Sequence, residues 1–184
     1  MGRKETADQL LHDCGLLAEL TKYGNVHPIG SYRMDMMAWN DLDLDVENDG
    51  MSLEKLYRLT SFILETFRPV WYEAKEEIAP DGKRVWFHGF ETMITGQLWN
   101  VDIWFFDKEK IEAAAAYCDS IVQQTTPEQK RQIVAIKEEL IHRGLYSFEA
   151  YRSMDVYKAV TELGIGTPEQ FLREYPIRVS GGKR

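Results

Sequence analysis

The sequence is poor in cysteine, with two in 184 residues, Cys14 and Cys118. They lie far apart and each has helix-like neighbours, which favours buried free thiols over a disulfide. A disulfide would indicate a secreted protein, so this interpretation favours a reducing compartment. The sequence also lacks an apolar run of membrane-spanning length and an N-terminal stretch of the signal-peptide type. We therefore expect a cytoplasmic protein with no membrane partner.

Positive charge is also scarce. Lys and Arg number 22 against 30 Asp and Glu, which gives a net charge of -8. A general nucleic-acid binder needs a basic face for the phosphates, so this balance argues against that class. An acidic protein can still bind a nucleotide if a metal ion supplies positive charge locally.

Several motifs of catalysis and metal binding are missing as well. The chain has no Gly-x-Ser-x-Gly, Cys-x-x-Cys or phosphate-loop lysine pattern. Its four histidines share no ligand spacing, which makes structural or solvent-exposed roles the default for them. These are His12, His27, His88 and His142.

The remaining composition is that of an ordinary globular protein, with 44% hydrophobic, 28% charged and 12% aromatic residues. The length allows one domain with a sizeable core, or such a domain with a helical appendage. No linker-like stretch divides the chain. We expect an α+β fold: a core at 1–106 with a mixed sheet flanked by helices, and a helical C-terminal region at 107–184 packed on it.

Hydrophobic spacing and turn residues predict the individual elements. The helices of the core are expected from Thr6 to about Tyr23 and from Leu53 to about Phe67. The strands are expected at Val26–Ile29, Asp41–Glu47, Val70–Ile78, Arg84–Met93 and Gln97–Phe106. Later helices are expected to begin at Thr126, Ser147 and Thr167, and the tail Ser180–Arg184 is expected to be disordered.

The most informative stretch is the strand Asp41–Glu47, in which aspartate alternates with aliphatic residues. Successive side chains of a strand point to opposite faces, so the aliphatic residues can enter a core while the three aspartates share the other face. Like charges side by side repel one another and raise each other's pKa, and a divalent cation relieves this. The alternative is a solvent-facing edge strand whose charges prevent aggregation. The three acids are Asp41, Asp43 and Asp45.

Two further features complete a candidate site. Gly30-Ser31 follows a short apolar run, where backbone N–H groups and a hydroxyl can approach phosphate oxygens. Asp102 is the lone charge in the aromatic and aliphatic strand Gln97–Phe106, where burial without a partner would be costly. If the two acidic strands are neighbours with the same face outward, their carboxylates converge and could hold two divalent ions.

This layout resembles the nucleotidyltransferase superfamily, which includes DNA polymerase β, the aminoglycoside and lincosamide nucleotidyltransferases, and small bacterial antitoxin-like members. The shared pattern is Gly-Ser, about a dozen residues, Asp-aliphatic-Asp, and a third carboxylate on a later strand. Gly30-Ser31, Asp41-Leu42-Asp43 and Asp102 match it in this order, and the resemblance covers about Leu10–Phe106.

The resemblance implies a role for each of these residues. Asp41 and Asp43 would hold the nucleotide-bound metal, and Asp43 and Asp102 would hold the second ion. Asp102 would also accept the proton of the acceptor hydroxyl as a general base. Gly30 with Ser31 and Arg33 would contact the triphosphate of an NTP such as ATP. The implied cofactors are two Mg²⁺ or Mn²⁺ ions, with NTP as co-substrate.

Several alternatives stay open at this point. Asp43 and Asp45 could be the metal-binding pair, because all three acids of the strand point the same way; the distance to Gly30 favours Asp41 and Asp43, with Asp45 as the alternate ligand. Many members place a second glycine at the position of Asp35. Arg33 could instead pair with Asp35 on the surface. Four tryptophans, Trp71, Trp86, Trp99 and Trp104, are expected in core and hairpin packing rather than in a stacking platform.

The predicted function is transfer of a nucleoside monophosphate from NTP to a hydroxyl, with release of pyrophosphate. The acceptor is expected to be a small molecule, with antibiotics among the candidates, or a protein. The alternative is a non-catalytic binding module of the same fold, antitoxin-like or degenerate, that neutralises a partner protein. A third reading is a scaffold domain whose acidic strand is only solvated.

Overall fold

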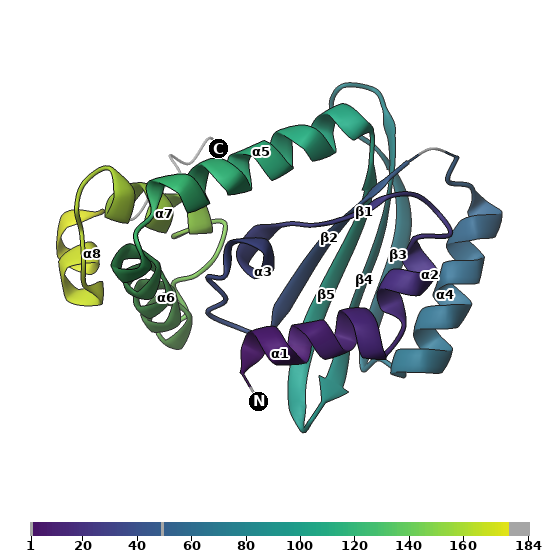
Figure 1. Ribbon diagram of the computed structural model, residues 1–184, viewed down its shortest axis with the longest axis horizontal. Coiled ribbons are helices and arrows are strands. Elements are labelled where there is room, and N and C mark those ends of the chain that lie inside the picture. Colours follow the sequence, from purple (N-terminus) through teal and green to yellow (C-terminus); the bar gives the residue numbers. More distant parts are fainter. Residues whose placement is uncertain (1, 49, 177–184) are drawn as a thin grey trace, which may run out of the picture. The chain divides into compact units, whose positions relative to one another are not determined.

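The computed structural model describes residues 2–48 and 50–176, and the chain divides into two compact units, Met1–Cys118 and Asp119–Arg184. The described residues of the first unit form a five-stranded sheet in the order β1-β2-β5-β4-β3 (Figure 1). The strands are β1 Val26–Pro28, β2 Asp41–Glu47, β3 Trp71–Ile78, β4 Arg84–Ile94 and β5 Gln97–Phe106. Since β2 pairs with β5 in parallel and the other neighbours are antiparallel, the sheet is mixed, and the predicted α+β fold is confirmed.

Both units contain helices. The first unit contains α1 Arg3–Asp8, the π-helix η1 Gln9–Asp13, α2 Leu16–Leu20, α3 Gly30–Met34 and α4 Leu53–Phe67. The division between the units falls within α5, Lys108–Gln124. The second unit continues with α6 Pro127–His142, α7 Ser153–Thr161 and α8 Pro168–Glu174. The predicted domain boundary after Phe106 stays a prediction.

The alternation in β2 divides the sheet into two faces. Leu42, Leu44 and Val46 are 0% exposed and belong to one hydrophobic cluster with Leu59 and Ile63 of α4. Burial of each such side chain contributes about 1.5–3 kcal/mol, so the aliphatic phase of the strand fixes which face meets the helix. The aspartates of β2 therefore lie on the face that α4 does not cover.

Two predicted helices differ from those observed. The helix expected from Thr6 to Tyr23 is interrupted, because η1 widens the spiral and Gly15 adopts a left-handed conformation with φ +79° before α2. The helix expected from Ser147 begins instead at Ser153, since the Ser147 hydroxyl accepts hydrogen bonds from the backbone N–H groups of Glu149 and Ala150 in a turn. The predicted disordered tail Ser180–Arg184 lies outside the described residues.

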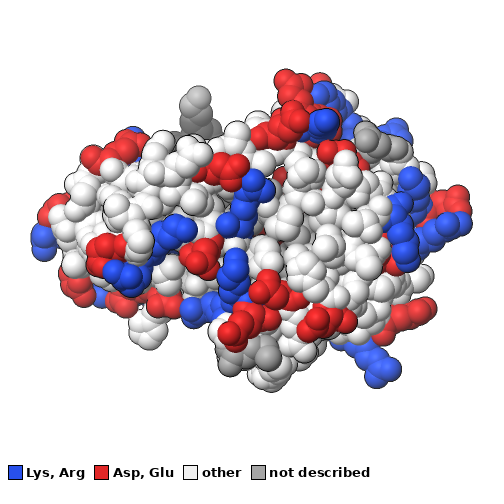
Figure 2. All heavy atoms as spheres, in the orientation of Figure 1, with Lys and Arg blue, Asp and Glu red and all other residues white. Residues whose placement is uncertain are grey.

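The surface carries charges of both signs. On the face drawn in Figure 2, Lys and Arg side chains are interspersed with Asp and Glu and form no continuous basic surface over the described residues. Over the same described ranges, no helix combines the length and the apolar character needed to cross a membrane.

Candidate functional site

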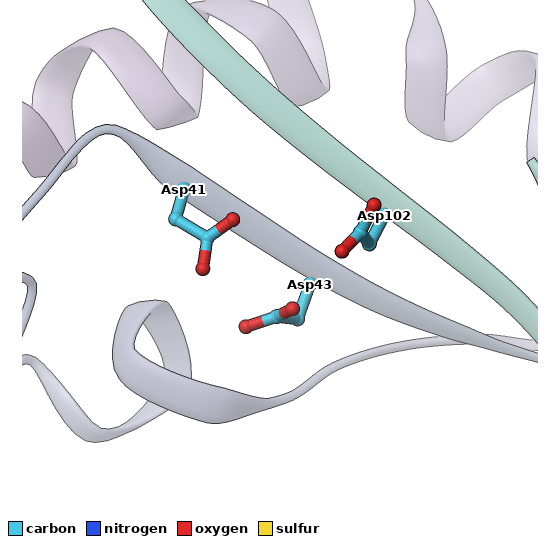
Figure 3. A group of neighbouring side chains, drawn as sticks. All are labelled: Asp41, Asp43 and Asp102. Atoms are coloured by element: carbon cyan, nitrogen blue, oxygen red, sulfur yellow. The ribbon is translucent and has the colours of Figure 1, made fainter. Parts of the chain in front are cut away.

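Three aspartates converge on the open face of the sheet. Asp43 of β2 lies directly opposite Asp102 of β5, and Asp41 lies opposite Asn100. One carboxylate oxygen from each of Asp41, Asp43 and Asp102 lies within 4.8 Å of the others. Figure 3 shows the three side chains pointing toward one another from the two neighbouring strands. The parallel pairing thus brings together three of the acids singled out in the sequence.

Asp45 is not part of this group. It lies opposite Trp104, is 2% exposed, and its Oδ1 has no hydrogen-bond partner among the described residues. Burial raises its pKa to about 6, and the positive charge of Lys110 offsets only part of that effect. Of the two pairings left open by the sequence, this geometry favours Asp41 with Asp43.

Gly30 lies against the acidic group. It begins α3 with φ +61°, and a Cβ at this position would overlap Oδ2 of Asp43. The backbone N–H of Ile29 donates a hydrogen bond of 3.1 Å to the carbonyl oxygen of Asp43, which holds the start of α3 beside β2. Glycine is therefore required here for two reasons: the left-handed backbone and the close approach of a carboxylate.

The residues after Gly30 form the short helix α3. The Ser31 side chain is buried, and its hydroxyl has no hydrogen-bond partner in the part of the chain that the structure describes. Arg33 lies in the last turn of α3 and is partly exposed. Asp35 ends the helix with φ 57° and ψ 46°, the left-handed region that glycine favours and that aspartate also tolerates. Aspartate at this position thus adopts a backbone conformation that glycine also favours.

Asn100 is a site residue that the sequence reasoning missed. Its Nδ2 donates a hydrogen bond of 2.9 Å to Oδ1 of Asp41, and hydrogen bonding by Asn100 also lowers the pKa of Asp102. Burial has the larger effect and raises the pKa of Asp102, and the charge of Glu73 on β3 raises it further. The signal was the strand period, since Asn100 precedes Asp102 by two residues and so shares its face.

The four tryptophans singled out in the sequence divide between the core and the hairpins, as expected. Trp86 and Trp99 are 2% and 0% exposed and belong to the core cluster. Trp71 is 43% exposed, and Trp104 is partly exposed opposite Asp45 on the acidic face. Trp104 packs against Phe87 across the β4–β5 hairpin, and Trp71 lies over Gly89 of the neighbouring strand β4, so the expected hairpin packing holds for these two. Their strand phase places them on the same face as the aspartates, where they stay partly accessible.

The acidic group has the donor set of a hard divalent cation. Mg²⁺ and Mn²⁺ prefer carboxylate oxygens, and three such oxygens within 4.8 Å of one another can be bridged by ions bound between them. The three carboxylates place like charges at close range, so cation binding would lower their mutual repulsion. The residues present fit a divalent metal site.

Solved structures share this arrangement of elements. No protein-family model and no curated protein matches the chain. The Cid1 poly(U) polymerase with MgGTP bound is 15% identical with a TM-score of 0.62, over 87% of this chain and 50% of that one. The polymerase core of TRAMP, an RNA surveillance complex, is 20% identical with a TM-score of 0.57, over 85% and 47%. A cytoplasmic RNA terminal U-transferase is 17% identical with a TM-score of 0.53, over 85% and 45%.

The chain has the nucleotidyltransferase fold. The fold named by the sequence resemblance is therefore confirmed. The chain spans about half the length of the polymerases that it matches, so the nucleotidyltransferase fold is the extent of the likeness.

Proposed function

We propose that this protein is a metal-dependent nucleotidyltransferase that transfers a nucleoside monophosphate from an NTP to a hydroxyl group. The observation that carries the proposal is the convergence of Asp41, Asp43 and Asp102 at one spot on the open sheet face. The structures of Cid1 poly(U) polymerase with MgGTP and with Mg 3′-dATP bound support Mg²⁺ and an NTP, ATP included, as the ligands.

Each carboxylate has a distinct role in this proposal. Asp41 and Asp43 would hold the nucleotide-bound Mg²⁺ or Mn²⁺, and Asp43 and Asp102 would hold the second ion. Two ions bound there supply positive charge at the phosphate oxygens and at the attacking hydroxyl. A carboxylate oxygen of Asp102 would accept the hydroxyl proton. The acceptor oxygen then bonds to the α-phosphorus, and the bond from the α-phosphorus to the bridging oxygen breaks, with pyrophosphate as the leaving group.

The start of α3 would bind the triphosphate. Gly30 leaves room beside Asp43, where any side chain would overlap the carboxylate. The Ser31 hydroxyl is buried and unpartnered among the described residues, which is costly unless a ligand oxygen accepts its hydrogen bond. Arg33, two residues further along the helix, would add positive charge to this phosphate-binding end.

We propose a small hydroxyl compound, with antibiotics among the candidates, or a protein as the acceptor. We also propose a cytoplasmic location, because Cys14 and Cys118 are both free thiols. The core of the enzyme would be 1–106, with the helical region 107–184 as its accessory part.

Thermal unfolding with Mg²⁺ and each NTP tests the nucleotide site. We expect Mg²⁺-dependent stabilisation that is lost in Asp43→Asn, because that substitution removes the carboxylate shared by both ions. The matched control is Asp81→Asn, at an exposed turn position where the amide oxygen can still accept the hydrogen bond from the N–H of Lys83.

Transfer of a labelled NMP to a panel of hydroxyl compounds tests the chemistry. Asp102→Asn should retain Mg–NTP stabilisation and lose transfer by at least 10²-fold, the usual contribution of a general base. Transfer that survives Asp102→Asn would remove that residue from its role. A tight complex with a partner protein that is indifferent to Asp43→Asn, without NTP stabilisation, would favour the non-catalytic alternative.

A further inference from the structure

The open face of the sheet continues from the aspartates into a hollow. Directly across the strands, Asp43 faces Asp102, Asp102 faces Gly89 of β4, and Gly89 faces Glu73 of β3. A hollow of about 450 Å³ lies over this part of β3, β4 and β5, with Asp102 in its lining. Its volume is in the range of small-molecule sites, and it lies on the Asp102 side of the acidic group.

Aromatic rings form the walls of this hollow. Gly89 has no side chain, and the rings of Phe87 and Trp71 lie over it so closely that a Cβ at position 89 would overlap Phe87. Trp104 packs against Phe87 with ring centroids 4.5 Å apart. Trp71 and Trp104 remain partly accessible and border the same hollow. Faces of this kind bind flat or ring-shaped groups and attract cations.

The charge of the lining is negative even without the metal-binding acids. Glu91 lines the hollow, and among the described residues its carboxylate has no ion-pair or hydrogen-bond partner. Glu73 lies 3.2 Å from Nζ of Lys75, but that ammonium is also 2.8 Å from Glu77. Lys75 is the one basic residue of the lining, so two glutamates and a shared lysine leave an excess of negative charge.

We propose that this hollow binds the acceptor, and that the acceptor is a small hydroxyl compound carrying an amine cation and a ring. The inference rests on the proposed function, because Asp102 would take the proton of the hydroxyl bound there. An ammonium group would pair with Glu91 and Glu73, while the ring lies against Trp71 or Trp104.

The same lining disfavours a nucleic-acid end as acceptor. A terminal 3′-hydroxyl is followed within one nucleotide by a phosphodiester, and that anion would meet Glu91 and Glu73 at the surface of the hollow. Lys75, the basic residue of the lining, is already shared between two carboxylates. The negative lining is therefore complementary to a cationic acceptor and not to the RNA ends that the structural neighbours extend.

Matched pairs of probes test this inference on the full chain. The first pair is chitobiose, a glucosamine disaccharide, against its neutral N,N′-diacetyl form. The second pair is phenylethanolamine against neutral phenylethylene glycol. The third probe is a single-stranded oligoribonucleotide with a free 3′-hydroxyl. Binding is measured by calorimetry with Mg²⁺ and α,β-methylene-ATP present, and transfer is measured with labelled ATP.

We expect the cationic member of at least one pair to bind tenfold or more tightly than its neutral partner. Glu91→Gln and Glu73→Gln should each weaken that binding about fivefold, because an ion pair near a protein surface contributes up to about 1 kcal/mol. The control Glu65→Gln removes the same charge from an exposed position of α4, the helix on the opposite face of the sheet, and should leave binding unchanged. Using two glutamates keeps the test decisive if one variant fails to fold.

Three results would overturn the inference while leaving the proposed function intact. These are equal binding of both members of each pair, no binding of either cationic probe in the presence of bound nucleotide, and extension of the oligoribonucleotide. Failure of the protein to bind Mg–NTP at all is distinguishable from these, and would overturn the proposed function together with the acceptor site.

Discussion

Asp45→Asn separates the two pairings of acids that the sequence leaves open. Asp45 is 2% exposed, and burial raises its pKa from 3.8 to about 6. Protonated Asp45 thus contributes stability that is fully present below pH 3.8 and is lost as the pH rises through about 6. The shift of about two units corresponds to about 3 kcal/mol lost at pH 7.5.

The substitution should recover most of this loss. A neutral amide has no charge to desolvate, but one buried amide group without a partner costs about 1 kcal/mol. We expect Asp45→Asn to raise the free energy of unfolding by about 2 kcal/mol at pH 7.5, which shifts the melting temperature by about 4–8 °C. As the pH falls below 3.8 the gain should vanish and turn into a loss of up to about 1 kcal/mol, because Asp45 becomes neutral in both states while the unpartnered amide keeps its cost.

The assay is a set of thermal or urea unfolding curves from pH 3.5 to 8, with EDTA present to exclude divalent ions. Transfer activity and Mg–NTP stabilisation are measured on the same variant, with Asp43→Asn alongside. If Asp41 and Asp43 are the metal-binding pair, the Asp45→Asn variant keeps both transfer activity and Mg–NTP stabilisation. Loss of Mg–NTP stabilisation as complete as in Asp43→Asn, or a stability gain independent of pH, would refute the reasoning.

Two further predictions concern Gly30 and His88. Gly30→Ala should lower the free energy of unfolding by about 1–2 kcal/mol, because the backbone at position 30 is left-handed. It should also abolish Mg–NTP stabilisation in thermal unfolding, because the new Cβ overlaps Oδ2 of Asp43. The control Gly82→Ala, with φ +83° and nothing within 4 Å, should lower the stability equally and leave Mg–NTP binding unchanged; equal nucleotide binding by both variants would contradict the steric argument. Burial lowers the pKa of His88 from 6.5 to about 4, so the free energy of unfolding should fall by about 3 kcal/mol as the pH drops from 6.5 to 4. His88→Gln should flatten this part of the plot of unfolding free energy against pH. If the slope remains in the variant, the acid sensitivity belongs to another group.

Local patterns were sufficient to predict most of the sheet. The bounds of β2 and β5 agree with the prediction because the aspartate–aliphatic alternation and the turn at Thr95-Gly96 are local signals. The same reliance on local signals made the prediction of one continuous first helix wrong. Leucines continue at helical spacing on both sides of Gly15, so their pattern could not reveal that the backbone there turns left-handed.

The site itself depends on pairing between segments that are distant in the sequence. Strand phase showed that Asp41, Asp43 and Asp45 share a face, but it could not show which of them would meet Asp102. The parallel register sets Asp43 opposite Asp102 and Asp45 opposite Trp104. A shift of this register by two residues would set Asp45 opposite Asp102 and Asp43 opposite Asn100 without changing any local pattern.

Two glycines lie on either side of the aspartates, at the places where we propose that the nucleotide and the acceptor bind. Gly30 has no side chain where Asp43 approaches, so α3 begins in contact with the acidic group. Gly89 has no side chain beside Asp102, so the rings of Phe87 and Trp71 pack directly over its backbone. Both rings line the hollow. Replacing Gly89 by alanine should displace these rings. If Asp102 takes its proton from a hydroxyl bound in that hollow, Gly89→Ala should impair acceptor binding while Mg–NTP stabilisation remains, and equal loss of both would contradict the separation of the two sides.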